Sequence, residues 1–306
     1  MIRTSDTLED LVLAGCCLTI GSYDGIHLGH QHVIRQLLAA ARARRMPSVV
    51  LSFYPHPSVV LQGRRPAYYL TSPEEKAFLL DQLGVDYLIT MRFDRQLSRL
   101  HANEFLDKIA SYLHPVDLWV GPDFAFGYER EGDIAFLQQV GGSYGFGLHI
   151  VEPIRLDGQP VSSTRVRTAL REGDVALAAS LLGRKVDLPA RASRLESLGT
   201  AGELRRIQLT HWSERAVPGH GWYACRLKTS QGVAAAAARL PEGLPGDERV
   251  PTTLTCYAGS SFRIDQGEQA TLIFIDRLSP MPADEGSAGF VDGMLGHIGR
   301  IPRLID

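Results

Sequence analysis

The chain has 306 residues, 44% of them hydrophobic, which is enough to form the cores of about two globular domains. Its 32 basic and 34 acidic residues give a net charge of -2 without a basic tract, which argues against duplex nucleic acid as a partner. No apolar run approaches the roughly 20 residues that span a bilayer, and the N-terminus lacks a signal-peptide pattern, so we expect a cytoplasmic protein with no membrane partner. The four cysteines show no Cys-x-x-Cys spacing and are expected to be reduced packing residues.

An apolar run at residues 11–20 predicts a strand that is buried on both faces at the centre of a parallel sheet. It leads into the sequence Gly-Ser-Tyr-Asp-Gly-Ile-His-Leu-Gly-His at residues 21–30. Apolar residues then recur at spacings of three and four up to position 41, and arginines follow, which predicts a helix. Phosphates commonly bind where a buried strand turns into a helix, so this segment predicts a nucleotide site.

The residue types within residues 21–30 fit this interpretation. Gly21 and Gly25 allow a tight turn and a close approach of the backbone to a ligand, and Gly29 removes a side chain where the helix begins. His27 and His30 are expected to project from one side of the first helical turn and to donate hydrogen bonds to a polyphosphate. The alternatives are solvated histidines or metal ligands. Because no cysteine or third histidine nearby completes a set of metal ligands, we favour phosphate over metal.

Strand and helix patterns alternate along the following residues. Short apolar or β-branched runs predict strands at residues 48–53, 86–91, 116–120 and 147–152, and other patterns predict helices at residues 74–83, 101–113, 133–140, 163–171 and 174–182. Thr71 or Ser72 is expected to cap the helix at residues 74–83, with Pro73 at its first position and Gly84 after its end. This alternation predicts an α/β fold with a Rossmann-like, doubly wound parallel sheet of about five strands. In such sheets ligands bind outside the carboxyl ends of the strands.

Two further segments follow predicted strands. Pro55, His56 and Pro57 come after the strand at residues 48–53 and predict a rigid loop. Residues 121–127 hold an acceptor, Asp123, and two aromatic residues, Phe124 and Phe126. The aromatic residues could form a stacking wall for a flat heterocycle, or equally anchor the loop by packing, so Asp123 is the stronger functional candidate.

A fourth segment, at residues 161–167, combines a helix cap with cations. Ser162, Ser163 and Thr164 supply hydroxyls, and Arg165 and Arg167 supply guanidinium groups, a combination suited to gripping phosphates. The alternative is a solvated arginine beside a simple cap. The presence of the first loop favours the phosphate interpretation.

With these segments in place, residues 1–185 resemble the adenylyltransferase module of bacterial bifunctional riboflavin kinase/FAD synthetases. The resemblance includes residues 21–30, Ser-Phe-Tyr-Pro-His-Pro at 52–57, Leu-Thr-Ser at 70–72 with Glu-Lys at 75–76, and Gly-Val-Asp at 84–86. It continues with Phe-Leu at 105–106, residues 121–127, Gly-Asp at 132–133, residues 162–167, Gly-Asp-Val at 173–175 and Leu-Leu-Gly-Arg at 181–184. One departure is Ser22, where the family commonly has asparagine.

The resemblance implies a nucleotidyltransferase that joins FMN to the adenylyl group of ATP and makes FAD and pyrophosphate without a covalent enzyme intermediate. It assigns the ATP phosphates to His27 and His30, and the triphosphate or its departing end to Ser163, Thr164 and Arg167.

The resemblance implies further binding residues. Gly21, Tyr23, Asp24 and Gly29 would belong to the nucleotide loop, the Pro55-His56-Pro57 loop would shape the flavin entrance, and Asp123 would face the nucleotide or the flavin. Mg²⁺ is also implied, because pyrophosphate leaves poorly without a counter-charge. No carboxylate cluster in the sequence indicates where Mg²⁺ would bind.

Residues 186–306 depart much further from the family. Its riboflavin kinase barrel carries a Gly-Phe-Pro-Thr-Ala-Asn segment and a catalytic glutamate on a later strand, and we find neither here. Residues 251–253 do not replace that segment, and Thr-Leu-Thr at 253–255 stands roughly where the glutamate strand is expected. Predicted strands at 221–227, 252–257 and 270–278 and a helix at 290–298 nevertheless indicate a small antiparallel barrel. We therefore expect a degenerate riboflavin-kinase-like barrel without kinase activity; the alanine run at 234–238 indicates no chemistry.

Two other functions stay open at this point. The first is a related nucleotidyltransferase with another phosphorylated acceptor, because the His-x-Gly-His loop is shared across that superfamily. The second is a flavin- or nucleotide-binding regulator without catalysis. The sequence leaves the oligomeric state undecided.

Overall fold

The computed structural model describes residues 1–63, 68–200, 202–242, 253–278 and 289–301. These residues form two compact units, one made of Met1–Arg64 and Thr71–Ser162 and the other of Arg65–Leu70 and Ser163–Asp306.

The first unit is built on a parallel sheet whose inner strand β2 (Cys16–Ile20) is buried along its whole length. The sheet order is β1-β4-β3-β2-β5-β6. Its other strands are β1 (Arg3–Ser5), β3 (Ser48–Tyr54), β4 (Tyr87–Arg92), β5 (Pro115–Val120) and β6 (Gly147–Ile150). The predicted Rossmann-like fold is confirmed, with six strands in place of about five. The additional strand is β1, whose three residues are too few to show a period in the sequence.

The strand predicted at residues 11–20 begins only at Cys16, so this prediction was too long. The backbone N–H groups of Leu11 and Leu13 instead donate to the carbonyls of Leu8 and Tyr112, at 3.1 and 2.9 Å. Apolar residues alone do not distinguish such a loop from a strand, because a strand also needs a neighbouring strand with which to pair.

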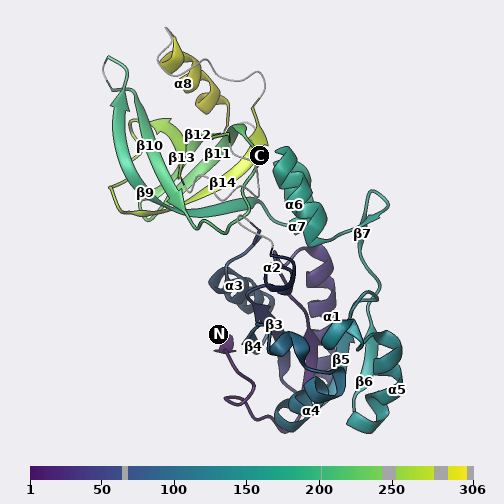
Figure 1. Ribbon diagram of the computed structural model, residues 1–306. Helices are drawn as coiled ribbons and strands as arrows, with labels where there is room; N and C mark the ends of the chain where they lie inside the picture. Colours follow the sequence, from purple (N-terminus) through teal and green to yellow (C-terminus); the bar gives the residue numbers. More distant parts are fainter. Residues whose placement is uncertain (64–67, 201, 243–252, 279–288, 302–306) are drawn as a thin grey trace. The chain divides into compact units, whose positions relative to one another are not determined.

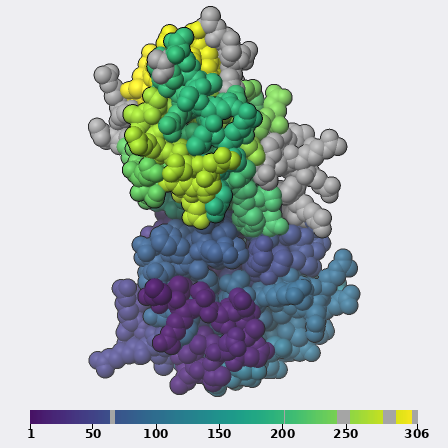
Figure 2. Space-filling model, turned by 90° about the vertical axis from the view of Figure 1, so that its left-hand side faces the viewer, coloured from purple at the N-terminus to yellow at the C-terminus, as the bar shows by residue number. Residues whose placement is uncertain are grey.

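Helices cover both faces of this sheet (Figure 1). Helices α1 (Leu28–Arg44) and α3 (Pro73–Leu83) contribute to one hydrophobic cluster with β2, β3 and β4, and α4 (Ala102–Leu113) and α5 (Ile134–Tyr144) contribute to the other. Ser72 caps α3 in a capping box with Pro73 first and Gly84 after its end, as predicted. A short helix α2 (Pro57–Gln62) lies where only a rigid loop was predicted, because Pro57 is suited to the first helical position. In Figure 2 the N-terminal residues, in purple, form part of the surface of this unit.

The remaining short elements of the first unit lie in its connections. They are two 3₁₀ turns, η1 (Leu97–Arg99) and η2 (Tyr128–Arg130), and a small hairpin of β7 (Arg155–Leu156) and β8 (Gln159–Pro160).

The second unit contains α6 (Ser163–Glu172), α7 (Val175–Leu182) and a closed antiparallel barrel, which confirms the predicted barrel. The barrel strands are β9 (Val186–Leu198), β10 (Leu204–His211), β11 (Gly221–Thr229), β12 (Gly232–Leu240), β13 (Thr253–Gly259) and β14 (Gln269–Arg277). The alanine run forms most of β12, where Ala237 packs in a cluster with Met294 of α8 (Phe290–Arg300). Pro251 and Thr252, part of the segment compared above with the kinase motif, lie outside the described residues.

The four cysteines are all buried and free, as expected of packing residues. Burial raises the pKa of the Cys16 and Cys256 thiols to about 12, so both stay protonated at neutral pH. Within the described ranges, no helix combines the length and the apolarity that crossing a membrane requires.

Candidate functional site

The loop between β2 and α1 has an unusual backbone. Tyr23, Gly25 and Ile26 have φ angles of 47°, 88° and 40°, so three residues out of four are in the left-handed region. Gly25 was expected to allow such a turn. Gly21 has no positive φ; a Cβ there would lie 3.1 Å from the Tyr23 ring, so the absent side chain leaves room for that ring. A Cβ at Gly29 would lie 3.1 Å from the His27 ring.

The two histidines of this loop stack on each other, with ring centroids 3.6 Å apart. His27 is the N-cap residue of α1, one position earlier than the predicted first turn, because its Nδ1 accepts the backbone N–H of His30 at 3.3 Å. An accepting Nδ1 places the ring proton of the neutral imidazole on Nε2. His27 is only 5% exposed, whereas His30 is partly exposed and lies beside Tyr23 at a centroid distance of 4.9 Å. His27 therefore has a fixed tautomer, and His30 is the more accessible imidazole of the two.

Asp24 fixes the other side of the loop. Its carboxylate is buried and accepts the backbone N–H and the hydroxyl of Thr71, at 3.1 and 3.4 Å. The Thr71 hydroxyl oxygen in turn accepts the N–H of Gly25 at 3.1 Å. Asp24 was predicted to bind nucleotide; its carboxylate holds the loop to Thr71, and its contact with nucleotide stays a prediction.

Lys76 had no functional role predicted from the sequence. Its ammonium is buried and donates to the carbonyl of Ser22 at 2.7 Å and to the hydroxyl of Ser52, on β3, at 2.8 Å. Burial lowers the pKa of Lys76 from 10.5 to about 8, and the nearby Asp24 carboxylate acts against this decrease. A signal was present in the sequence, because Lys76 and Leu80 are four residues apart on the buried face of α3, where apolar side chains are expected.

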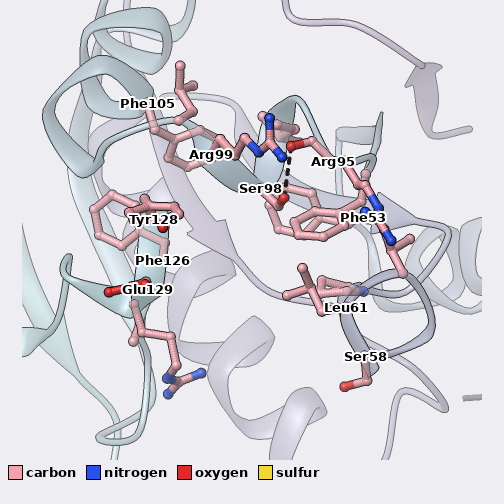
Figure 3. A pocket seen from close by; sticks show the side chains of 18 of the residues that line it. Phe53, Ser58, Leu61, Arg95, Ser98, Arg99, Phe105, Phe126, Tyr128 and Glu129 are labelled. Carbon is pink, nitrogen blue, oxygen red and sulfur yellow. Dashed lines mark hydrogen bonds between the residues drawn. The ribbon is translucent and has the colours of Figure 1, made fainter. Parts of the chain in front are cut away.

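A cavity of about 640 Å³ opens among the loops that follow β3, β4 and β5. That volume falls in the range of small-molecule sites. Figure 3 shows Phe53 and Leu61 on one side of it and Phe126 and Tyr128 on the other. Leu61 is 61% exposed although it is apolar. The arginines among its lining residues are Arg95, Arg99 and Arg130.

The predicted flavin loop borders this cavity. Pro57 is among its lining residues, and His56 caps α2 by accepting the Ser58 N–H on Nδ1 at 3.0 Å. His56 thus repeats the capping geometry of His27. Pro55 lies between the end of β3 and this cap.

The residues of the loop after β5 differ in how the structure bears on their predicted roles. Phe126 lines the cavity, and Phe124 and Phe126 both pack against the α4 and α5 side of the core, with their rings 5.5 Å apart. Packing therefore accounts for Phe124, whereas Phe126 both packs and lines the cavity. Asp123 is exposed and lies outside the cavity lining, and its carbonyl accepts from Arg130 at 3.2 Å. Its side-chain role stays a prediction.

The residues of the fourth segment are divided between the two units. Ser162 belongs to the first unit, and Ser163 and Thr164 begin α6 in the second. Arg167 stacks its guanidinium on the Tyr68 ring at 3.8 Å and donates from Nε to the Tyr68 carbonyl at 2.7 Å. The roles of these residues in phosphate binding stay predictions.

Histidine, cysteine and carboxylate side chains do not gather in groups of three or more that could hold a metal in the described part of the chain. The buried carboxylate of the nucleotide loop, Asp24, already accepts from Thr71.

Comparison with known proteins gives one family and several relatives. The family model for FAD synthetase matches residues 10–165. The bifunctional riboflavin kinase/FMN adenylyltransferase of Escherichia coli K12 is 38% identical over 200 residues, which cover 65% of this chain and 64% of the relative. This chain thus spans slightly less than two thirds of that relative's length. The protein of the same name from Pseudomonas fluorescens is 33% identical over 273 residues, 86% of this chain and 85% of the relative.

One solved structure is similar over the full length of both chains. The crystal structure of a macrolide-efflux protein from Streptococcus pneumoniae has a TM-score of 0.83, covers 100% of each chain and is 23% identical in sequence. At that identity the likeness shows the fold alone.

Proposed function

This chain belongs to the FAD synthetase family, as its motifs predicted, and on that premise we propose that it transfers the adenylyl group of ATP to FMN. The single observation that carries the proposal is the loop of residues 21–30, with its stacked imidazoles, at the same carboxyl edge of the sheet as a flavin-sized cavity.

In the proposed reaction a phosphate oxygen of FMN attacks the α-phosphorus of ATP. The new bond joins the two phosphates as FAD forms, and the bond from the α-phosphorus to the bridging oxygen breaks, so that pyrophosphate leaves with the electron pair. The protein's contribution is to position the FMN phosphate and the α-phosphate of ATP, and to neutralise charge on the departing pyrophosphate. Mg²⁺ would arrive as part of the ATP substrate and neutralise further charge.

The imidazoles suit this task. The Nε2–H of His27 is a donor because Nδ1 caps the helix, and the N-terminal end of the α1 dipole adds positive potential. His30 lies in contact with His27 and is more exposed, which suits it to the departing pyrophosphate. Arg167, Ser163 and Thr164 are proposed to bind the triphosphate by analogy with the family's motif.

The lining of the cavity between the loops after β3, β4 and β5 is suited to a flat aromatic acceptor. Phe53 and Phe126 offer apolar walls, and the arginines in its lining are suited to an anionic ligand. We propose that it holds the flavin ring of FMN, with Pro57 at its border.

We further propose that the barrel does not phosphorylate riboflavin. None of the strands β11, β12, β13 and β14 contains a glutamate, and the sequence has no Gly-Phe-Pro-Thr-Ala-Asn segment. The barrel fold remains although the residues that carry the kinase chemistry in the family are missing.

The test is a pair of incubations of the purified full chain with ATP and Mg²⁺, one with FMN and one with riboflavin, followed by chromatographic separation of the flavins. FAD is expected from FMN only, with one pyrophosphate released per FAD. Pyrophosphate release with a different phosphorylated acceptor but no FAD would point to a related nucleotidyltransferase. Tight ATP or FMN binding without turnover would point to a regulator, and FMN formed from riboflavin would contradict the proposal for the barrel.

A further inference from the structure

The buried ammonium of Lys76 lies beneath the loop that the proposed function places at the ATP phosphates. It donates to Ser22 and Ser52, and the Ser52 hydroxyl also donates to the Ser22 carbonyl, at 3.0 Å. Two donors from different elements, α3 and β3, therefore converge on one backbone oxygen. A buried ammonium is costly, so a position that keeps one is a candidate for function.

The Ser22 carbonyl belongs to the peptide that precedes Tyr23, whose φ of 47° is unfavourable for a residue with a side chain. Holding that carbonyl fixes the orientation of this peptide. The Tyr23 ring then packs beside His30 at 4.9 Å, and its hydroxyl is hydrogen-bonded to Thr19 on β2. A continuous series of contacts thus leads from Lys76 to the His30 imidazole.

We propose that Lys76 is a positioning residue for adenylyl transfer, which holds the Ser22 carbonyl and through Tyr23 sets the place of the His30 imidazole. The inference deepens the proposed function and rests on it. Asp24 is the charged group that faces Lys76 from the β2 loop, whereas Ser22 and Ser52 bring uncharged atoms. Lys76 touches no reacting atom in this role and acts through its neighbours.

The test compares Lys76→Met, which keeps the length and removes the charge, with Lys76→Arg and with Lys108→Met, a control at an exposed lysine on α4. Misplacing a catalytic group by about 1 Å can cost about 10²-fold in rate, so Lys76→Met is expected to lower kcat by about 10²-fold. The KM for FMN should change little, because the cavity is lined by other loops. Lys108→Met should match the wild type. A kcat of Lys76→Met within about threefold of the wild type would overturn the proposal.

A pH profile separates positioning by the charge from a merely structural role. The pKa of Lys76 is about 8, so kcat of the wild type is expected to fall as the pH rises through that value. Arginine does not lose its proton in this range, so Lys76→Arg should retain its activity up to about pH 9.5. A wild-type profile without this fall, or the same fall in Lys76→Arg, would overturn the proposal. These two profiles decide the matter if circular dichroism shows that Lys76→Met does not fold.

A readout without turnover distinguishes failure of this inference from failure of the proposed function. The Cε1–H resonance of His30, measured by NMR without substrate, should shift in Lys76→Met and stay in place in Lys108→Met. If Lys76→Met is unfolded, the His30 resonance of the wild type should shift as the pH rises through about 8 by more than that of Lys76→Arg. If the wild type makes no FAD, the proposed function is wrong. The His30 resonance then still tests whether Lys76 positions the His30 imidazole. An unchanged His30 resonance would overturn it.

Discussion

The substitution Asp24→Asn tests the electrostatics beneath the nucleotide loop. Asp24 and Lys76 are both buried, at 2% and 6% exposure, and the carboxylate favours the charged form of the amine. Replacing the carboxylate by an amide keeps the shape and an acceptor for Thr71 but removes the negative charge. The buried ammonium then lacks its counter-charge at neutral pH.

The expected loss depends on pH, with a sign that follows from the pKa of Lys76. This pKa is lowered from 10.5 to about 8, so burying the charged amine costs stability below about pH 8, and that stability returns as the pH rises from about 8 towards 10.5. One pH unit below its pKa the amine can release its proton at a cost of about 1 kcal/mol, which limits the charge-dependent loss at pH 7; with about 1 kcal/mol for the weaker hydrogen bonds to Thr71, we expect Asp24→Asn to lose about 2 kcal/mol at pH 7. At about pH 9.5 the amine is largely neutral in both proteins, so only the weaker hydrogen bonds to Thr71 differ, worth about 1 kcal/mol.

The assay is urea unfolding of the wild type and of Asp24→Asn at both pH values, followed by far-UV circular dichroism and by hydrogen exchange of residues 16–30. Asp6→Asn, at an exposed carboxylate, is the control and should change stability by less than about 0.5 kcal/mol at either pH. A loss for Asp24→Asn that is equal at the two pH values would refute the coupling between the carboxylate and Lys76.

Three further substitutions test the site and its scaffold. His30→Ala is expected to slow adenylyl transfer by about 10²- to 10³-fold, which is the cost of losing one transition-state donor. The control, His32→Ala on the same helix, should keep the wild-type rate. A wild-type rate for His30→Ala would remove His30 from the site. Leu61→Ser is expected to raise the KM for FMN about tenfold at constant kcat, because it removes apolar contact area from the cavity wall, and Phe78→Ser, at 63% exposure outside the cavity, is the control. Gly127→Ala is expected to lower the free energy of unfolding by about 1–3 kcal/mol in thermal or urea melts, since its φ is 77° and a Cβ would lie 2.9 Å from a backbone nitrogen of α4; an unchanged melt would contradict this.

Much of the first unit could be predicted because its signals are local. The buried run before residue 21, the Ser72 and Pro73 start of α3 and the Gly84 end each depend on neighbouring residues alone. The same holds for the order of elements, which predicts a parallel sheet and therefore the edge at which the loops meet. The family motifs lie in these loops, so both the fold and the position of the candidate site followed from them.

Other features depended on partners that are distant in the sequence. The alanine run gave no signal of its own, yet it pairs with β11 and β13 as β12, since a small side chain is accepted wherever neighbouring strands supply the hydrogen bonds. Strand β1 exists only because β4 lies beside it. The walls of the cavity come from loops after three strands, so Leu61 and Tyr128 gave no indication of a shared site.

The sequence alone determined the α/β order, the loop of residues 21–30 and the family, because each depends on consecutive residues. Only the tertiary structure decided that Lys76 lies buried beneath that loop, 2.7 Å from the Ser22 carbonyl. The physical reason is that burial, pKa and hydrogen-bond direction depend on atoms brought together by folding, and for Lys76 those atoms are more than 20 residues away along the chain.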